Sequence, residues 1–322
     1  MTNTSKPYDL TGKRVWVAGH RGMVGSAIVR RLESENVAEI LSATRAELNL
    51  KDKAAVDAWM DENKPDAIFL AAAKVGGIHA NSVYPADFLY DNLAIASNII
   101  HKAHDIGTEK LLFLGSSCIY PKFADQPIEE CSLLSGALEP TNEWYAIAKI
   151  AGIKLCQAYR QQHGSDFISA MPTNLYGPGD NYHLENSHVI PALIRKAYNA
   201  REEGAESMEI WGSGTARREF MHADDCADGL VFLMKNYSGH EHVNVGQGDD
   251  IPIEDLARLI MKLVGFKGTL TKDTTKPDGT PRKLMSNARM SALGWTPTRQ
   301  LEDGLEDAIS WFEAHLDTIR EV

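Results

Sequence analysis

Cysteine is scarce in this sequence, and its few copies lie far apart. The chain of 322 residues has four cysteines and no CxxC pair. They stand at positions Cys118, Cys131, Cys156 and Cys226. Cysteines so sparse and without CxxC spacing indicate neither a disulfide framework nor a structural zinc site. We therefore expect no disulfide and no metal, and a reducing, cytoplasmic location.

Positive charge and long apolar runs are also in short supply. The chain has 33 Lys and Arg against 44 Asp and Glu, a net charge of −11. Nucleic acids and anionic membranes are bound by clustered cations, so neither is expected as a partner, although a few local cations can still hold a small anion. Residues 1–20 carry no cationic segment followed by an apolar one, and no later stretch could cross a bilayer. We expect a soluble, unexported protein.

Short apolar runs alternate with amphipathic segments through the first half of the chain. This alternation predicts a parallel sheet with helices on both faces, which is an α/β fold with a doubly wound sheet. The expected strands are 13–19, 38–43, 66–73, 110–117 and 166–172, and the expected helices are 22–35, 52–63, 85–106 and 143–162.

Beyond residue 176 the loops become longer and richer in Gly, Pro, Asn and His. We predict a dinucleotide-binding domain over 1–176 and a smaller α/β substrate lobe over 177–322, with helices at 189–202, 252–264 and 301–318. Ligands of open α/β sheets bind at the carboxyl ends of the strands, where such a lobe would lie. The segment 219–246 is a candidate to return to the first domain.

Three glycines follow the first expected strand, in VWVAGHRGMVGSAI. Gly19, Gly22 and Gly25 leave the backbone free of Cβ atoms, so it can approach a pyrophosphate at the positive end of a helix. The alternative is an ordinary glycine-rich turn. Because the motif lies between a strand and a helix, we interpret it as a dinucleotide site.

Charged residues near this turn bear on which dinucleotide binds. NAD sites usually carry an acid after the second strand, whereas NADP needs a cation for its 2′-phosphate. Arg21 lies in the glycine turn and Arg45 follows the second strand, and both favour NADP(H). Glu47 could still play the NAD role, and either arginine could be a solvated surface charge.

Tyr145 and Lys149, in NEWYAIAKIAG, lie four residues apart and so share one face of a helix. A tyrosine phenol has an ordinary pKa near 10, and an adjacent ammonium would bring that pKa toward neutrality. Ser116, at the end of a strand, can donate a hydrogen bond to the same substrate oxygen. The set is typical of hydride-transfer chemistry, although the YxxxK spacing also recurs by chance in amphipathic helices.

Cys118 follows Ser116 by two residues, in LGSSCIYP. If the strand continues, residues i and i+2 point to the same side, so both side chains would face one pocket. From these residues alone, a small buried hydrophobe is the favoured interpretation of Cys118, because free cysteines are usually buried and inert. For His188, at an expected helix start, a capping or surface role is the favoured interpretation from these residues alone.

Longer motifs carry a resemblance to a known family. The chain resembles the extended branch of the short-chain dehydrogenase/reductases, and within it the bifunctional epimerase-reductases of nucleotide sugars. The resemblance rests on GHRGMVGSAI, AAAKVGGIHAN, GSSCIYPK, EPTNEWYAIAKIAG, MPTNLYGPGDN, NSHVIPALIRK, WGSGTARREFMHADD and KPDGTPRK. It implies a Rossmann-type domain and NADPH-dependent conversion of GDP-4-keto-6-deoxy-D-mannose to GDP-L-fucose.

The resemblance also implies roles for individual residues. Cys118 would be the base and His188 the acid for epimerisation at C3 and C5, after which hydride reduces C4 and Tyr145 protonates the alkoxide. Ser116 and Lys149 complete the catalytic set. The implied cofactor-binding residues are Gly19, Arg21, Gly22, Met23, Val24, Gly25, Arg45, Leu114, Lys149, Asn174, Leu175 and His188.

Substrate contacts are expected in the second lobe. The resemblance places the GDP-sugar at Lys196, Trp211, Arg218 and Asp278, with Arg217 as a further candidate for the diphosphate. Position 196 is commonly arginine in this family, so lysine gives up the two-pronged contact that a guanidinium makes. These cations could equally be solvated surface charges. A homodimer through helices 85–106 and 143–162 is also implied, with simple burial against the sheet as the alternative.

Two other functions are compatible with these motifs. The first is an NAD-dependent nucleotide-sugar 4-epimerase or 4,6-dehydratase of the same branch, which Arg21, Arg45 and the Cys118/His188 pair disfavour. The second is a non-catalytic NADPH-binding regulator, which has no need of an intact Ser116, Tyr145 and Lys149 set.

Overall fold

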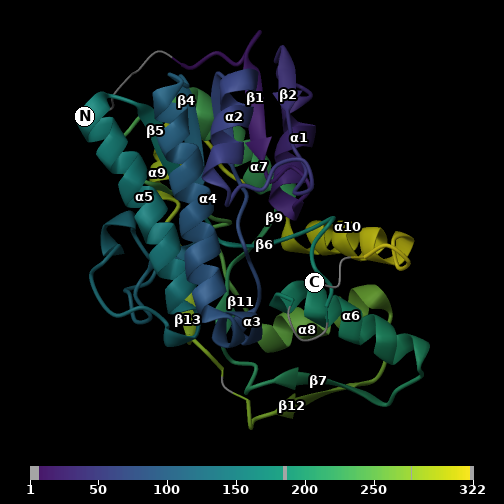
Figure 1. The fold of residues 1–322 in the computed structure, drawn as a ribbon. Helices are drawn as coiled ribbons and strands as arrows, with labels where there is room; N and C mark the ends of the chain where they lie inside the picture. The colour runs from purple at the N-terminus through teal and green to yellow at the C-terminus, as the bar shows by residue number, and fades with distance from the viewer. Residues whose placement is uncertain (1–6, 184–186, 277, 320–322) are drawn as a thin grey trace.

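A parallel sheet forms the centre of the first domain. The computed structural model describes residues 7–183, 187–276 and 278–319 (Figure 1). The six strands run in the order β10-β5-β4-β3-β1-β2, and every neighbouring pair is parallel. Their bounds are β1 (Arg14–Ala18), β2 (Glu39–Leu41), β3 (Ala67–Leu70), β4 (Lys110–Leu114), β5 (Asp166–Pro172) and β10 (Val243–Val245). The predicted α/β class is confirmed.

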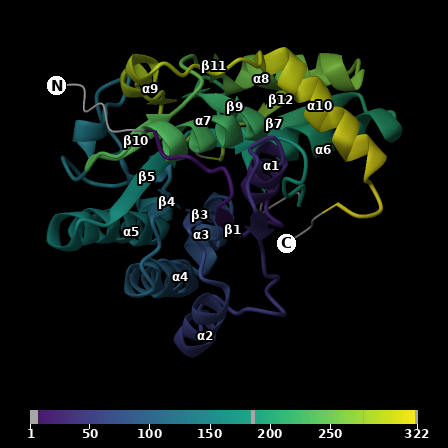
Figure 2. The same ribbon diagram turned by 90° about the horizontal axis from the view of Figure 1, so that it is seen from above.

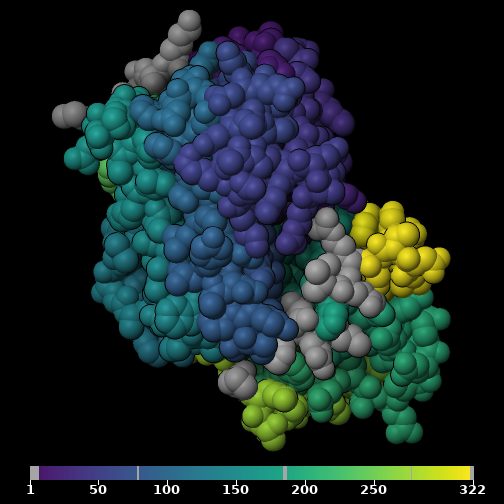
Figure 3. Space-filling view, in the orientation of Figure 1, coloured from purple at the N-terminus to yellow at the C-terminus, as the bar shows by residue number. Residues whose placement is uncertain are grey.

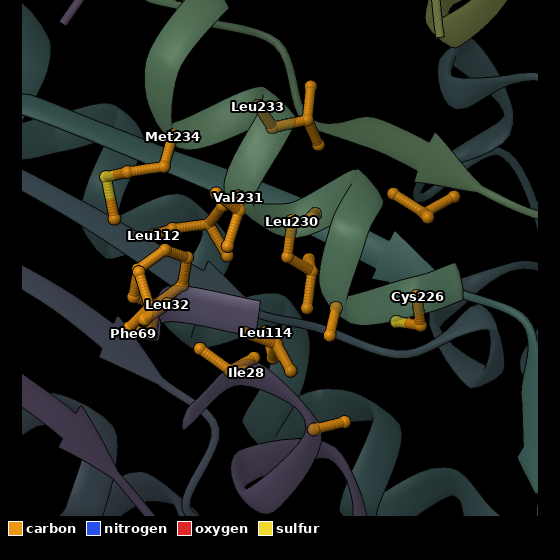
Figure 4. Packing of buried hydrophobic residues seen from close by; sticks show 14 of the residues in the cluster. Ile28, Leu32, Phe69, Leu112, Leu114, Cys226, Leu230, Val231, Leu233 and Met234 are labelled. Carbon is orange, nitrogen blue, oxygen red and sulfur yellow. The ribbon is translucent and has the colours of Figure 1, made fainter. Parts of the chain in front are cut away.

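Helices cover both faces of this sheet because its strands are apolar on both sides. On one face lie α2 (Lys53–Asn63), α4 (Pro85–Asp105) and α5 (Glu143–His163), and on the other lie α1 (Met23–Leu32) and α7 (Ala223–Asn236) (Figure 2). In Figure 4, Ile28 and Leu32 of α1 meet Leu112 of the sheet and Val231 of α7. Each face therefore has its own apolar core.

The order in which strands are added to the sheet reverses at β1, and this reversal marks a place where a ligand can bind. From β1, the connection through α1 leads to β2 on one side, while α2 leads to β3 on the other side and lies on the opposite face. The carboxyl ends of β1 and β3 therefore flank a topological switch point, where open α/β sheets bind their ligands.

One part of the second half of the chain lies on the first domain. β10 pairs with β5 at the edge of the large sheet, and α7 packs against α1. The strands β6 (Asn174–Tyr176) and β9 (Phe220–His222) pair with each other and connect this region to the rest of the chain.

The second lobe has a separate core between helices and a small sheet. It contains α6 (Val189–Glu202), α8 (Ile253–Val264), α10 (Leu301–Ala314) and the parallel pair β7 (Ser207–Trp211) and β12 (Thr269–Asp273). A second small sheet places β8 (Arg217–Arg218) between β11 (Ile251–Pro252) and β13 (Arg282–Lys283). In Figure 3, this green and yellow lobe lies below the purple surface of the first domain.

Short elements complete the chain. They are α3 (Ile78–Val83), α9 (Ala288–Leu293) and the 3-10 turns η1 (Ser117–Ile119), η2 (Glu130–Ser132) and η3 (Pro140–Asn142). Within the described ranges, none of the helices has the length and apolar character required to span a membrane.

Several predicted elements end earlier than expected. The first helix ends at Leu32 rather than residue 35, and the last ends at Ala314 rather than residue 318. Residues 315–318 are exposed, so packing does not stabilise further turns of helix there. The strand expected over 110–117 ends at Leu114, a difference that matters for the site.

Candidate active site

Backbone segments lie very close together at the glycine turn, with no room for a Cβ atom at Gly19 or Gly25. Gly19 has φ +94°, and a Cβ there would lie 2.7 Å from the amide nitrogen of Ala72, just after β3. A Cβ on Gly25 would lie 2.0 Å from the carbonyl oxygen of Gly19. Gly22 precedes α1 and has no side chain to accept from the amides of its first turn. Those amides are thus available to a pyrophosphate at the switch point.

The charges beside this turn favour NADP over NAD. Arg21 and Arg45 are both exposed, the first in the turn and the second beyond the end of β2. The carboxylate of Glu47 accepts a hydrogen bond from the backbone N–H of Thr44 at 2.7 Å, which lowers the pKa of Glu47. One oxygen of the acid that could have held the ribose of NAD is therefore engaged by its own turn.

The other cofactor residues surround the same edge of the sheet. Met23 and Val24 open α1 and pack on the apolar core, and Leu114 is the buried last residue of β4. Asn174 lies in β6, and its amide donates to the carbonyl oxygen of Glu219 at 2.8 Å, with Leu175 next in the strand. The arrangement is compatible with the predicted cofactor contacts, which remain predictions.

Ser116 and Cys118 are not related by the extended geometry that we expected. β4 ends at Leu114, and Ser116 caps the turn η1, its hydroxyl accepting from the backbone N–H of Cys118 at 3.3 Å. The local hydrogen bond from a serine cap competes with continued strand structure. Both residues nevertheless affect the pKa of the Tyr145 phenol, which Cys118 raises and a hydrogen bond with Ser116 lowers.

Tyr145 and Lys149 lie on one face of α5, as expected. The Lys149 ammonium is 5.7 Å from the centre of the Tyr145 ring and donates to the carbonyl oxygen of Leu114 at 2.7 Å. Burial lowers the pKa of Lys149 to about 7. The expectation that this lysine would lower the pKa of Tyr145 is wrong here: burial, and then Cys118, raise that pKa, and the bond with Ser116 only opposes them. The phenol of Tyr145 is therefore neutral at neutral pH.

Two residues that the sequence did not reveal contact the Cys118 sulfur. The amide nitrogen of Asn142 lies 3.3 Å from it, and the ammonium of Lys283 lies 3.6 Å from it. Asn142 stands one helical turn before Tyr145, a spacing that could have identified it. Lys283 is 165 residues from Cys118, so no local pattern could have done so.

His188 precedes α6 as its N-cap residue, but its side chain makes no capping bond. The residue is open to water, while the protein around its ring lowers the pKa of the imidazole. The expectation of an imidazolium at pH 7 is therefore weakened. Within the described part of the chain, no hydrogen bond joins His188 to Ser116, Cys118 or Tyr145.

The four predicted substrate residues form one cluster in the second lobe. The Lys196 ammonium lies 5.2 Å from the centre of the Trp211 ring and donates to the carbonyl oxygen of Glu209 at 3.2 Å. Asp278 accepts from the backbone N–H of Ser213 at 2.7 Å, in the turn after Trp211. Burial lowers the pKa of the Arg218 guanidinium, and nearby Asp278 opposes this. An aromatic face, two cations and an acid suit a nucleoside diphosphate.

Two neighbouring cations differ from the sequence-based expectation. Arg217 pairs with Asp250 at 2.6 Å, and the Asp250 side chain is only 3% exposed. Its charge is thus committed, and Arg217 is a poor diphosphate ligand. Lys276, which the sequence did not single out, lies 5.3 Å from the centre of the Trp211 ring and adds a cation to the cluster.

Comparison with known proteins identifies the family. The model of the NAD dependent epimerase/dehydratase family matches residues 15–246. The chain is 58% identical over 299 residues to GDP-L-fucose synthase 1 of Arabidopsis thaliana, covering 93% of both chains. It is 53% identical to GDP-L-fucose synthase of Escherichia coli, covering 97% of this chain and 100% of that one.

Solved structures agree with this match. A GDP-L-fucose synthetase from Naegleria fowleri bound to NADP superposes with a TM-score of 0.90 at 28% identity, covering 98% of this chain and 99% of that one. The resemblance to the extended branch of the short-chain dehydrogenase/reductases is confirmed. The chain therefore belongs to the NAD dependent epimerase/dehydratase family.

Proposed function

We propose that this protein is a bifunctional enzyme that converts GDP-4-keto-6-deoxy-D-mannose to GDP-L-fucose, by epimerisation at C3 and C5 followed by reduction at C4. The proposal rests on curated GDP-L-fucose synthases at 53% and 58% identity over most of the chain. The observation that carries it is Cys118, a thiol placed beside Ser116 and Tyr145 in one site. A simple ketoreductase has no use for a base at that place.

The cofactor is NADP(H), which supplies hydride to C4 of the sugar when it is bound. The predicted cofactor agrees with the NADP named for the Naegleria fowleri structure. Gly19, Gly22 and Gly25 would hold its pyrophosphate, and Arg21 and Arg45 its 2′-phosphate.

Epimerisation follows from the acidity of hydrogens next to a carbonyl. The thiolate of Cys118 removes the proton from C3 or C5 and becomes a thiol, and the electron pair moves to the C4 oxygen, which Ser116 and Tyr145 hold by hydrogen bonds. His188, whose lowered pKa makes the imidazolium the minor form at neutral pH and a stronger proton donor, then returns a proton to the opposite side of that carbon. Proton exchange with solvent resets both groups, and the exposure of His188 to water serves this step.

Reduction uses the same oxygen. As hydride reaches C4, the neutral phenol of Tyr145 gives its proton to the forming alkoxide. Lys149 lies along the same helix face and, with a pKa of about 7, exists in both protonation states at neutral pH. It can therefore supply a proton to Tyr145 between turnovers.

The domain boundary, the dimer and the location are part of the proposal. We assign residues 1–176 to cofactor binding, with a return at 219–246, and 177–322 to the nucleotide sugar. We assign a homodimer to the faces of α4 and α5, on which Tyr90, Trp144 and Ile147 are 66%, 43% and 37% exposed. The enzyme would work in the cytoplasm, where its four thiols stay free.

Product analysis tests this function directly. The protein is incubated with GDP-4-keto-6-deoxy-D-mannose and NADPH, and the product is identified by NMR. GDP-L-fucose is the expected product. A 6-deoxyhexose that keeps its original configuration at C3 and C5 would show that the protein is only a ketoreductase. Activity on GDP-mannose with retained NAD would instead indicate a dehydratase.

A further inference from the structure

We propose that Lys283, together with Asn142, holds the sulfur of Cys118 as a thiolate and so acts as a positioning residue for the epimerisation base. Two donors approach this sulfur, the Asn142 amide at 3.3 Å and the Lys283 ammonium at 3.6 Å. In the orientation seen, both groups direct N–H hydrogens at the sulfur, and such donors stabilise S⁻. The inference deepens the proposed function and rests on it.

Strand pairing aims the Lys283 side chain at the site. β13 pairs with β8, with Arg282 opposite Arg217 and Lys283 opposite Arg218. Successive residues of a strand point to opposite faces. Arg282 turns to one face and pairs with Asp250, so Lys283 points to the other, toward Cys118.

The backbone around Lys283 is fixed on both sides. Its carbonyl oxygen accepts from Glu219 at 3.3 Å, on the β8 side. Leu284 is bonded to the segment that follows the Cys118 turn: its N–H donates to the Gln126 side chain at 2.8 Å, and its carbonyl oxygen accepts from Ile128 at 2.8 Å. The lysine is thus carried by a rigid strand that is tied to the same loop as the thiol.

The other cations that line the pocket beside Cys118 each have an ion-pair partner, and Arg282 shares its partner, Asp250, with Arg217. Lys122 pairs with Glu139 at 2.9 Å, and Arg282 pairs with Asp250. Tyr145 is neutral, and its pKa is raised partly by Cys118 itself. Among the described residues, no carboxylate forms an ion pair with Lys283. Its charge is therefore available to the sulfur.

The test measures the thiolate directly, in full-length protein without substrate. Cys131, which is exposed, is replaced by serine in every sample. Burial raises the pKa of Cys156 and of Cys226 to about 12, so thiolate absorbance near 240 nm below pH 9.5 reports on Cys118. Lys283→Met is compared with Lys283→Arg, which keeps the charge, and with Arg282→Met, which disturbs the neighbouring position of the same strand.

We expect Lys283→Met to move the midpoint of the absorbance change up by about one pH unit, because a nearby opposite charge favours the ionised form by about that much or more. Iodoacetamide labelling of Cys118, measured at a pH at least one unit below both midpoints, should slow by about threefold, since the thiolate fraction there falls about tenfold while the remaining thiolate is about threefold more nucleophilic. Lys283→Arg and Arg282→Met should leave both values near those of the parent.

An unchanged midpoint in Lys283→Met would overturn the proposal, and so would Lys283→Arg shifting as far as Lys283→Met. Deuterium incorporation from D₂O into the sugar separates this inference from the proposed function. If the midpoint moves but no deuterium ever enters C3 or C5, Lys283 stabilises the thiolate and the epimerase function fails. If deuterium enters and the midpoint stays, only the role of Lys283 fails.

Discussion

Replacement of Gly152 by alanine tests whether α5 must lie this close to the sheet. A Cβ at position 152 would be 2.3 Å from Cζ of Phe113 in β4. Carbon atoms in contact need about 3.7 Å, so the helix or the ring would have to move by about 1.4 Å. Tyr145 and Lys149 lie on the same helix, two turns and one turn before Gly152, and would move with it.

Two effects of opposite sign compete in Gly152→Ala. In an unconstrained helix, alanine is about 1 kcal/mol more favourable than glycine. Overpacking a core costs about 1–3 kcal/mol, so we expect a net loss of up to about 2 kcal/mol in the free energy of unfolding. Misplacement of reacting groups by about 1 Å can lower kcat by about 100-fold.

Urea unfolding and steady-state oxidation of NADPH measure the two effects. The double variant Phe113→Leu with Gly152→Ala should recover part of both losses, because the smaller side chain makes room for the Cβ. A Gly152→Ala protein that is about 1 kcal/mol more stable than the parent and fully active would refute the reasoning.

Three further predictions follow from the site. Burial holds the pKa of Lys149 near 7, below that of an unfolded lysine. Burying the charged ammonium therefore destabilises the folded protein fully below pH 7, and this destabilisation disappears as pH rises toward 10.5. The free energy of unfolding of the parent should therefore rise with pH relative to Lys149→Met, by up to about 1.4 kcal/mol per unit, in urea titrations; parallel profiles would contradict this. Lys196→Arg should tighten GDP binding severalfold by calorimetry, because a guanidinium binds diphosphate with two prongs; unchanged affinity would place the diphosphate elsewhere. Arg45→Glu should lower the preference for NADPH over NADH more than tenfold in kcat/KM, and an unchanged ratio would remove Arg45 from the 2′-phosphate site.

The parts of the fold that were predictable depend on local sequence. The buried strand β3 consists entirely of apolar residues, as does β4 after its first residue, Lys110, and the helices between such strands carry an apolar stripe. The ends of these elements were less predictable. Caps and tertiary contacts decide where a strand stops, as Ser116 does after β4.

The same division holds for the candidate site. The glycine turn and the Tyr145/Lys149 pair are local, so their spacing identifies them. The contact between Lys283 and Cys118 joins residues 165 positions apart through the pairing of β13 with β8, which no motif encodes. The raised pKa of Tyr145 results from burial, which the YxxxK pattern does not include.

Deuterium incorporation at C3 and C5 tests the central role of Cys118 most directly. GDP-4-keto-6-deoxy-D-mannose and NADPH are incubated in D₂O with the parent or with Cys118→Ser, and the products are examined by NMR. We predict GDP-L-fucose with deuterium at both carbons for the parent, and no exchange for the variant, since a hydroxyl is far too weak an acid to serve as this base. Equal exchange in the two proteins would show that Cys118 only packs beside Ser116 and that the base lies elsewhere.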